Sequence, residues 1–397
     1  MLQCSMNVDH YFDWAATSPQ DADILKESLQ ISIEHFANPS SSHKAGSDAR
    51  LVLENARALC AHSLGTKPSQ LFFTSGGTES DALPLLSVLA GERKSGRIII
   101  SGVEHPAVRA QCDMLKKRGF DICTVNPDKN GFVDSQSIAD KITPDTLMVS
   151  VMAVNNETGC IQPVRAIAEQ IARASGGKRK AHFHVDCVQA AGKIPLCITE
   201  MGADSAAFSA HKISGPRGIG LLYLSEPGRF RPFLVGGGQE QNVRSGTENL
   251  FGAVALSKCL EKYAFCTETE RFLEQRSWTA DFIASLLSIP NCRLVPPLRA
   301  DLSRNVQELF SPWIVQAAFL GIPGQVMVRA LDAKGFCIST GSACSAKKQS
   351  RPILKAMSAP PEIQDSAVRF SFGAFTTKNG MDELLGAVKE VCSQFIG

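Results

Sequence analysis

The sequence predicts an α/β fold with a large domain built on a mainly parallel sheet and a smaller α/β domain. With 397 residues and 44% hydrophobic content, the chain is long enough for one large and one smaller core. Apolar runs rich in β-forming residues alternate with helical stretches, which is typical of βαβ units. These runs are LFFT near 71, RIIIS near 97, LMVSVMAV near 147, AHFHVD near 181, SAAFS near 205 and GIGLLYL near 218.

A long helical pattern follows the last of these runs, from about Gly252 to Leu287, and prolines at 290, 296 and 297 interrupt the chain after it. We expect the second domain to begin within this pattern. The expected large domain covers residues 14–258, and the expected small domain combines residues 1–13 and 259–397.

Composition excludes several classes of protein. Lys and Arg total 41 against 39 for Asp and Glu, a formal net charge of +2, so neither nucleic acid nor a membrane surface is the expected partner. The segment MLQCSMNVDHYFDW lacks the basic and apolar regions of a signal peptide, and no apolar run reaches the roughly 18 residues that a membrane span needs, so we expect neither a targeting segment nor a membrane span. The 13 cysteines lack C-x-x-C pairs, which favours reduced thiols over disulfides or a metal site. We therefore expect a cytoplasmic protein.

The segment SAHKISGPRGIG is the most informative part of the chain. Lys212 falls where the strand SAAFS ends and its loop begins, and this is the edge at which parallel α/β sheets bind ligands. A lysine amine held in a desolvated pocket can form a Schiff base with pyridoxal phosphate. Most lysines are solvated surface residues, so this interpretation depends on partners elsewhere in the sequence.

The segment LFFTSGGTES predicts a phosphate-binding turn. A strand leads directly into Ser75, Gly76, Gly77 and Thr78, and a helical stretch follows. Glycines let backbone amides approach an anion, and the positive end of a helix attracts it. A plain turn capped by Ser75 or Thr78 is the alternative. Pro84 is expected to kink or restart the helix.

The segment HFHVDCVQAAGK places Asp186 at the end of a buried strand, with Gln189 three residues later. This strand precedes the one that leads to Lys212, so on adjacent parallel strands the carboxylate and the amine would emerge at the same edge. A carboxylate there could keep a pyridine nitrogen protonated. Asp186 could instead cap a following helix.

Two further strand ends offer polar groups. His105 follows RIIIS and could stack on an aromatic cofactor, while Asn155 follows LMVSV and could bond a ring hydroxyl. Either could also be a loop residue whose hydrogen bonds are satisfied within the protein. Convergence of several such groups at one sheet edge indicates a ligand site.

Downstream segments add a thiol and an arginine. Cys344 lies in GSACSAKK, where small residues and nearby lysines favour an exposed thiolate. Cys337 lies in the apolar segment GFCIS, which favours a position in the hydrophobic core. Arg369 lies in the amphipathic AVRFSFGAF and could clamp a carboxylate with its planar fork. A surface arginine is the alternative.

Ten segments together resemble the cysteine desulfurases, in that family's order along almost the whole chain. They are YFDWAATSP, FANPSSSH, TSGGTESD, VEHPAV, VNNETGCIQP, HVDCVQAAGK, SAHKISGPRGIG, GGGQEQNVRSGTEN, STGSACS and VRFSFGAFTT. The resemblance implies a fold-type I enzyme that uses pyridoxal 5'-phosphate and forms homodimers. Ala37, Trp14, Ala82 and Pro84 depart from the commoner pattern, but none replaces a catalytic group.

The resemblance also implies a role for each matching residue. Lys212 would carry the cofactor as an imine, His105 would stack on its ring, and Cys344, in the small domain, would take the sulfur. Asn38 and Arg369 would hold the substrate carboxylate. Gln189 and Asn155 would reach the ring hydroxyl, and Thr247 would complete the phosphate site of the partner subunit. The full set of expected cofactor contacts is Gly77, Thr78, His105, Asn155, Asp186, Gln189, Ser209, Ala210, His211, Lys212 and Thr247.

The implied reaction converts L-cysteine to L-alanine and a persulfide on Cys344. The sulfur would then pass to a protein acceptor such as an iron–sulfur scaffold or a tRNA-thiolation enzyme. A selenocysteine lyase or a cysteine sulfinate desulfinase is the nearest alternative, although GSAC resembles the desulfurase branch. A class V aminotransferase would not need Cys344, and a protein that only binds a scaffold would not need Lys212.

Overall fold

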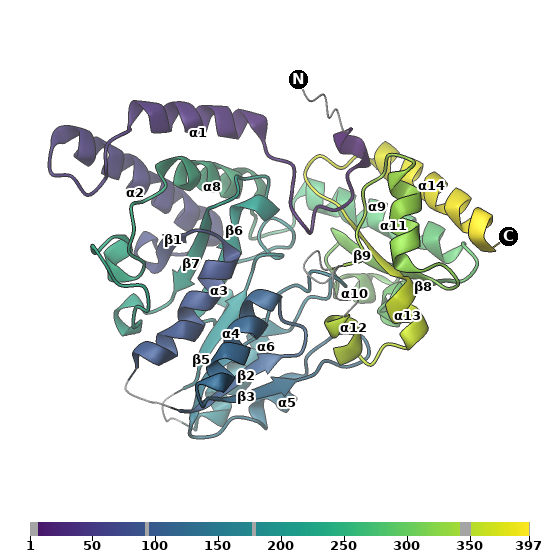
Figure 1. The fold of residues 1–397 in the computed structure, drawn as a ribbon, viewed down its shortest axis with the longest axis horizontal. Coiled ribbons are helices and arrows are strands. Elements are labelled where there is room, and N and C mark those ends of the chain that lie inside the picture. Colours follow the sequence, from purple (N-terminus) through teal and green to yellow (C-terminus); the bar gives the residue numbers. More distant parts are fainter. Residues whose placement is uncertain (1–6, 92–94, 177–179, 342–350, 397) are drawn as a thin grey trace.

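The computed structural model describes residues 7–91, 95–176, 180–341 and 351–396. Two sheets stand beside each other, the larger surrounded by helices on the left of Figure 1 and the smaller on the right. None of the helices in the described ranges combines the length and the apolar character that crossing a membrane requires. The mixed α/β architecture confirms the predicted fold class.

The larger sheet has seven strands in the order β1-β7-β6-β5-β4-β2-β3. Five neighbouring strands, from β6 to β3, run parallel, while β7 is antiparallel to both of its neighbours. The strands are β1 (Leu71–Thr74), β2 (Arg97–Ser101), β3 (Asp121–Val125), β4 (Thr146–Ser150), β5 (His182–Asp186), β6 (Ser205–Ser209) and β7 (Gly220–Leu224).

All six predicted apolar runs contain strands of this sheet, but the sequence reasoning missed β3. In β3 only Val125 is buried, because this strand lies at the edge of the sheet. Its sequence, DICTV, therefore lacks the continuous apolar run that marks the buried parallel strands.

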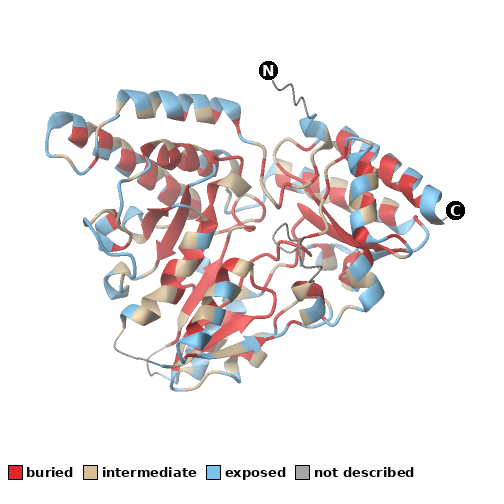
Figure 2. Ribbon diagram, in the orientation of Figure 1, coloured by how far each residue is buried: buried red, intermediate tan, exposed pale blue. Residues whose placement is uncertain are grey.

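Helices cover both faces of the larger sheet. Alternate residues of β2 show this, since Ile99 packs in the core beneath α2, α6 and α8, while Ile98 and Ile100 pack against α4. Most residues of the inner strands are accordingly buried, whereas α1 and α4 leave much of their surface exposed (Figure 2). The helices of this part are α1 (Ala22–Glu34), α2 (Lys44–Leu64), α3 (Gly77–Leu86), α4 (Pro106–Lys117), α5 (Ser135–Ala139), α6 (Val164–Ala174), α7 (Ile198–Met201) and α8 (Leu250–Tyr263).

The smaller sheet is antiparallel, with strand order β10-β9-β8, and has its own hydrophobic core. Its strands are β8 (Cys292–Val295), β9 (Ile314–Phe319) and β10 (Ala367–Ser371). Phe12 from the start of the chain packs into this second core. The helices that follow α8 are α9 (Glu270–Leu287), α10 (Arg304–Gln307), α11 (Gly324–Asp332), α12 (Pro352–Ala356), α13 (Pro361–Ser366) and α14 (Lys378–Ile396).

The prediction of one helical pattern from about Gly252 to Leu287 is wrong in one respect, because α8 and α9 are separate helices. The helix breaks at Ala264, whose backbone is extended, and α9 restarts where the Thr269 hydroxyl caps the amide of Phe272. Between them, Phe265 O accepts a hydrogen bond from Leu196 N, which ties the connection to the larger part. The proposed domain boundaries at 14 and 258 stay predictions.

Candidate active site

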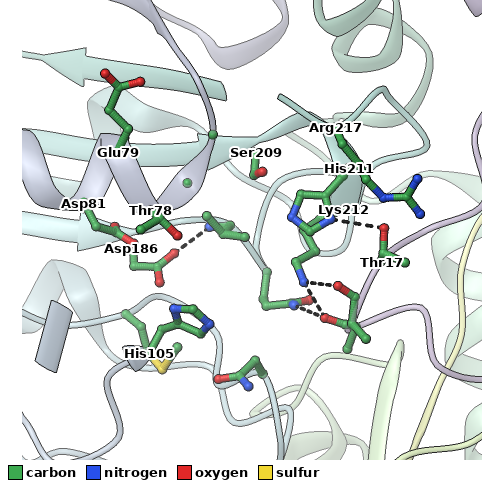
Figure 3. Close-up of a pocket in the computed structure, with 18 of the residues that line it drawn as sticks. Thr17, Thr78, Glu79, Asp81, His105, Asp186, Ser209, His211, Lys212 and Arg217 are labelled. Carbon is green, nitrogen blue, oxygen red and sulfur yellow. Dashed lines mark hydrogen bonds between the residues drawn. The ribbon is translucent and has the colours of Figure 1, made fainter. Parts of the chain in front are cut away.

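A cavity of about 510 Å³ lies between the two sheets, at the carboxyl ends of β5 and β6. It brings together residues that are as far apart in the sequence as Ala15 and Arg369. Several of its side chains appear in Figure 3, where Asp186 and His105 lie across from His211, Lys212 and Arg217. The predicted site residues that line it are Gly77, Thr78, His105, Asp186, Gln189, Ser209, His211, Lys212 and Arg369.

Lys212 ends a short 3₁₀ turn, Ala210–Lys212, that directly follows β6. Its Nζ donates hydrogen bonds to Ala15 O at 2.7 Å and to Ala16 O at 2.6 Å (Figure 3). The amine is thus held at the cavity wall by two backbone carbonyls. The predicted position of Lys212, at the carboxyl edge of a buried strand, matches this geometry.

Asp186 ends β5, the strand next to β6, and the two strands pair in parallel with Asp186 opposite Ala207. Its Oδ1 accepts a hydrogen bond from Val188 N at 2.9 Å, so the carboxyl also supports its own loop, although it caps no helix. Burial raises the pKa of Asp186 well above its usual range, and the nearby Asp81 carboxyl raises it further. A cation bound in the cavity would favour the ionised form of this carboxyl.

His105 is the N-cap of α4, and its Nδ1 accepts a hydrogen bond from Ala107 N at 3.1 Å. Burial lowers the pKa of His105 to about 4, and the positive charges of Lys212 and Arg109 act in the same direction. At neutral pH the ring is therefore uncharged, which suits stacking against an aromatic group. Capping and cavity lining are compatible roles, since one ring edge caps the helix while the ring borders the cavity.

The turn between β1 and α3 has a geometry that suits an anion, and we call it the candidate anion cradle. Gly76 adopts a φ of 150°, and α3 begins at Gly77 with no side-chain cap from any described residue. A Cβ on Gly77 would lie 2.7 Å from Val188 Cγ2, so a side chain there would clash. The uncapped first turn leaves backbone amides available at the positive end of the helix. Pro84 is tolerated inside α3, which ends soon afterwards at Leu86 and gives way to a 3₁₀ turn, Ser87–Ala90.

His211 faces this cradle from the far side of the cavity. Its Nδ1 lies 3.2 Å from Thr17 Oγ1 (Figure 3). Burial lowers the pKa of His211 to about 4, and Lys212 and Lys193 lower it further. A neutral imidazole whose orientation is set by Thr17 can donate its other N–H to an anion.

Arg369 is buried on β10, with 1% of its surface exposed, so the alternative of a surface arginine is wrong. Its Nη1 donates to Asn156 O at 2.8 Å, and its Nη2 pairs with Asp13 Oδ1 at 2.6 Å. The buried Nε makes no hydrogen bond to any described residue. A buried, incompletely paired guanidinium at a cavity wall is suited to binding a carboxylate.

The remaining predicted residues lie elsewhere. Asn155 is fully buried beside the cavity, where its Oδ1 accepts from Glu157 N and Thr158 N and its Nδ2 donates to Val103 O. Ala210 is buried in the turn after β6. Asn38 and Thr247 are exposed, and Asn38 Oδ1 accepts from Ser40 N. Cys344 lies outside the described residues.

Sequence reasoning missed a group of buried polar residues behind Asp186. His184, also on β5, lies with its Nε2 3.1 Å from Asp81 Oδ1 and its Nδ1 2.8 Å from Ser205 Oγ. Glu104 accepts a hydrogen bond from Met152 N at 2.7 Å, and burial raises the pKa of Glu104 to about 7. The available signal was the i, i+2 spacing of His184 and Asp186, which puts both on one face of the strand.

Comparisons with known proteins agree with this geometry. The model of the family Aminotransferase class-V matches residues 10–384. A cysteine desulfurase IscS from Dictyoglomus turgidum is 34% identical over 390 residues, covering 97% of this chain and 95% of the relative. A NifS/IcsS protein homolog from Lactobacillus delbrueckii subsp. bulgaricus is 37% identical over 388 residues, 97% of each chain. A solved NifS-like protein superposes with a TM-score of 0.84 at 31% identity, covering 97% of this chain and 99% of that one.

The chain therefore belongs to the class V aminotransferase family. Within that family, relatives named cysteine desulfurase match it over nearly its whole length. The resemblance predicted from the ten sequence segments is confirmed, and so is the predicted class of enzyme.

Proposed function

We propose that this protein is a pyridoxal-phosphate-dependent cysteine desulfurase, which converts L-cysteine to L-alanine and keeps the sulfur as a persulfide on Cys344. The observation that carries the proposal is the convergence of Lys212 and Asp186, from adjacent parallel strands, on one cavity that also contains the candidate anion cradle. The names of the relatives support the choice of substrate and reaction.

The residues of the cavity fit this cofactor. The amides at the start of α3, with Thr78, Ser209 and His211, would hold its phosphate, and His105 would stack on its ring. Asp186 would face the ring nitrogen, where its carboxyl can share a proton with a pyridine. When bound, pyridoxal phosphate supplies an electron sink for negative charge at the substrate α-carbon.

The protein's own groups would then act on the substrate. Arg369 would bind the carboxylate of L-cysteine, exchanging part of its pairing with Asp13 for the substrate. Lys212 Nζ would remove the α-proton and return a proton to the product. The Cys344 thiolate would attack the substrate sulfur, so that an S–S bond forms as the C–S bond breaks and alanine leaves.

A product assay tests the proposal against its nearest alternatives. The purified protein with pyridoxal phosphate should form L-alanine from L-cysteine, and the sulfur should appear on the protein. L-selenocysteine and cysteine sulfinate are supplied in parallel reactions. Turnover of L-selenocysteine or cysteine sulfinate without turnover of L-cysteine would support a selenocysteine lyase or a desulfinase. That result would exclude our proposal.

Replacing Arg369 should specifically weaken the handling of substrate. Arg369→Lys keeps a positive charge but loses the planar fork, so kcat/KM for L-cysteine should fall by at least about tenfold, or about 1.4 kcal/mol. Cofactor affinity, followed by absorbance, should stay near that of the wild type. Arg293→Lys, on the exposed side of β8, is the matched control. Kinetics equal to the wild type would place Arg369 outside the substrate site.

The working unit is proposed to be a homodimer. Exposed apolar side chains support an interface, because large apolar residues at the surface often mark association. Three of them, Phe233, Leu234 and Val235, precede the RSGT segment, and Leu29, Ile33 and Phe36 extend from α1 into the loop that follows it. The RSGT segment also contacts the start of α3 in its own chain. Arg244 Nε donates a hydrogen bond at 2.9 Å to Oε1 of Glu79, which lies in the first turn of α3.

Thr247 is exposed in the described chain, and we propose that it reaches the phosphate of the partner subunit. Thr247→Ala should weaken cofactor affinity about tenfold or more, because a hydrogen bond to a charged group contributes roughly 1.5–3 kcal/mol. Equilibrium dialysis measures the affinity, and light scattering should report twice the chain mass. Thr124→Ala, exposed on β3, is the control. A fully active monomer would contradict the shared site.

The sulfur acceptor and the compartment are part of the same proposal. Persulfide sulfur is expected to pass to a protein acceptor, either an iron–sulfur scaffold or a tRNA-thiolation enzyme. The cysteine pattern of the sequence, which favours reduced thiols, supports a cytoplasmic location.

A further inference from the structure

Lys193 is a buried lysine immediately behind the cavity. Only 5% of its surface is exposed, and it does not belong to the residues that line the cavity. Burial lowers the pKa of Lys193 well below its usual range, and the positive charges of Lys212 and Arg369 lower it further. Keeping such a costly group in the interior calls for a specific contact.

That contact is Gln189. Lys193 Nζ donates a hydrogen bond to Gln189 Oε1. At the other end of the same amide, Gln189 Nε2 donates to Ala15 O at 2.9 Å. The turn that brings the two residues together passes through Gly192, whose φ of 69° favours glycine.

The two contacts set the direction of the Gln189 amide. A carbonyl oxygen only accepts hydrogen bonds, so the end of the amide that faces Ala15 O must be the NH₂ group. A donor at Lys193 requires the oxygen at the opposite end. An amide held at both ends cannot rotate, and the second N–H of its NH₂ group remains for the cavity that Gln189 lines.

We infer that Lys193 is a positioning residue, which holds the Gln189 amide so that its NH₂ group donates to the ring oxygen of the bound cofactor. The inference rests on the proposed use of pyridoxal phosphate. Ala15 O also accepts from Lys212 Nζ, so the same carbonyl joins the positioning contact to the proposed cofactor lysine. Lys193 itself touches neither substrate nor cofactor in this scheme.

A double-mutant cycle on cofactor affinity tests the inference. Lys193→Met fills similar space without a donor, and it should weaken pyridoxal phosphate binding about tenfold in an otherwise wild-type chain, the size of one lost hydrogen bond. In the Gln189→Ala background the same change should have no further effect. Lys193→Arg, which keeps a donor, should recover most of the affinity. Equilibrium dialysis measures each variant, and Lys258→Met, on α8 outside the cavity, is the control.

The outcomes separate this inference from the proposed function. If the wild-type protein does not bind pyridoxal phosphate, the proposed function fails first. If it binds, but Lys193→Met weakens binding equally with and without Gln189, Lys193 supports the fold alone and the inference is wrong. If Lys193→Met does not fold, the cycle is run with Lys193→Gln. The amide of Lys193→Gln can accept as well as donate a hydrogen bond, so it no longer fixes which end of the Gln189 amide faces residue 193, and cofactor affinity should again fall.

Discussion

Lys212→Ala should abolish turnover of L-cysteine, with a loss of at least about a thousandfold. The change removes both the covalent attachment of the cofactor and the proposed acid–base group, and general acid–base catalysis alone contributes roughly 10²–10⁴-fold. Cofactor would still be held by its phosphate at the start of α3, because that cradle is built from other residues. The visible absorbance of the bound cofactor should therefore change rather than disappear.

Reduction with borohydride identifies the lysine directly. The wild-type protein should yield a pyridoxyl-modified peptide that contains Lys212, whose Nζ reaches the cavity wall at Ala15 O and Ala16 O. Lys193 is the informative internal control, because it is a buried lysine close to the same cavity. Modification of Lys193, or full turnover by Lys212→Ala, would show that the cofactor lysine is assigned wrongly.

Much of the site could be predicted because it follows from local rules. Polar residues at the ends of parallel strands share one edge of the sheet, so the sequence order of Asp186 and Lys212 implied that both face one cavity. The β5–β6 pairing bears this out, with Asp186 opposite Ala207. The glycines of the β1–α3 turn could be read in the same way, since few other residues fit a φ of 150° at Gly76.

Other features depend on packing between distant segments, which a local pattern does not encode. The Asp13–Arg369 pair joins residues 356 positions apart in the sequence. Arg369 could be read as a surface residue because burial of an arginine depends on such a partner. The Lys193–Gln189 contact spans only four positions, but it requires a left-handed backbone at Gly192. The break between α8 and α9 lies beside a hydrogen bond from Leu196 N to Phe265 O, which joins segments about 70 positions apart.

The thiol chemistry is open to a decisive test at Cys344, which the sequence alone identifies. In elimination, the sulfur leaves as free sulfide and no enzyme thiol takes part. In desulfuration, a thiolate must attack the sulfur and retain it. Cys344→Ser removes the nucleophile and leaves Lys212, Asp186 and Arg369 unchanged, so the two reactions predict opposite results.

Cys344→Ser should bind pyridoxal phosphate normally and show the wild-type spectral change on adding L-cysteine, yet form alanine at least about a thousandfold more slowly. Mass spectrometry of the wild-type protein after brief exposure to L-cysteine should find added sulfur on the Cys344 peptide. Cys337 is the matched control, since burial raises the pKa of its half-buried thiol and disfavours the thiolate. Wild-type turnover by Cys344→Ser, or pyruvate and free sulfide as products, would identify the protein as a β-lyase, because only elimination proceeds without a sulfur-accepting thiol.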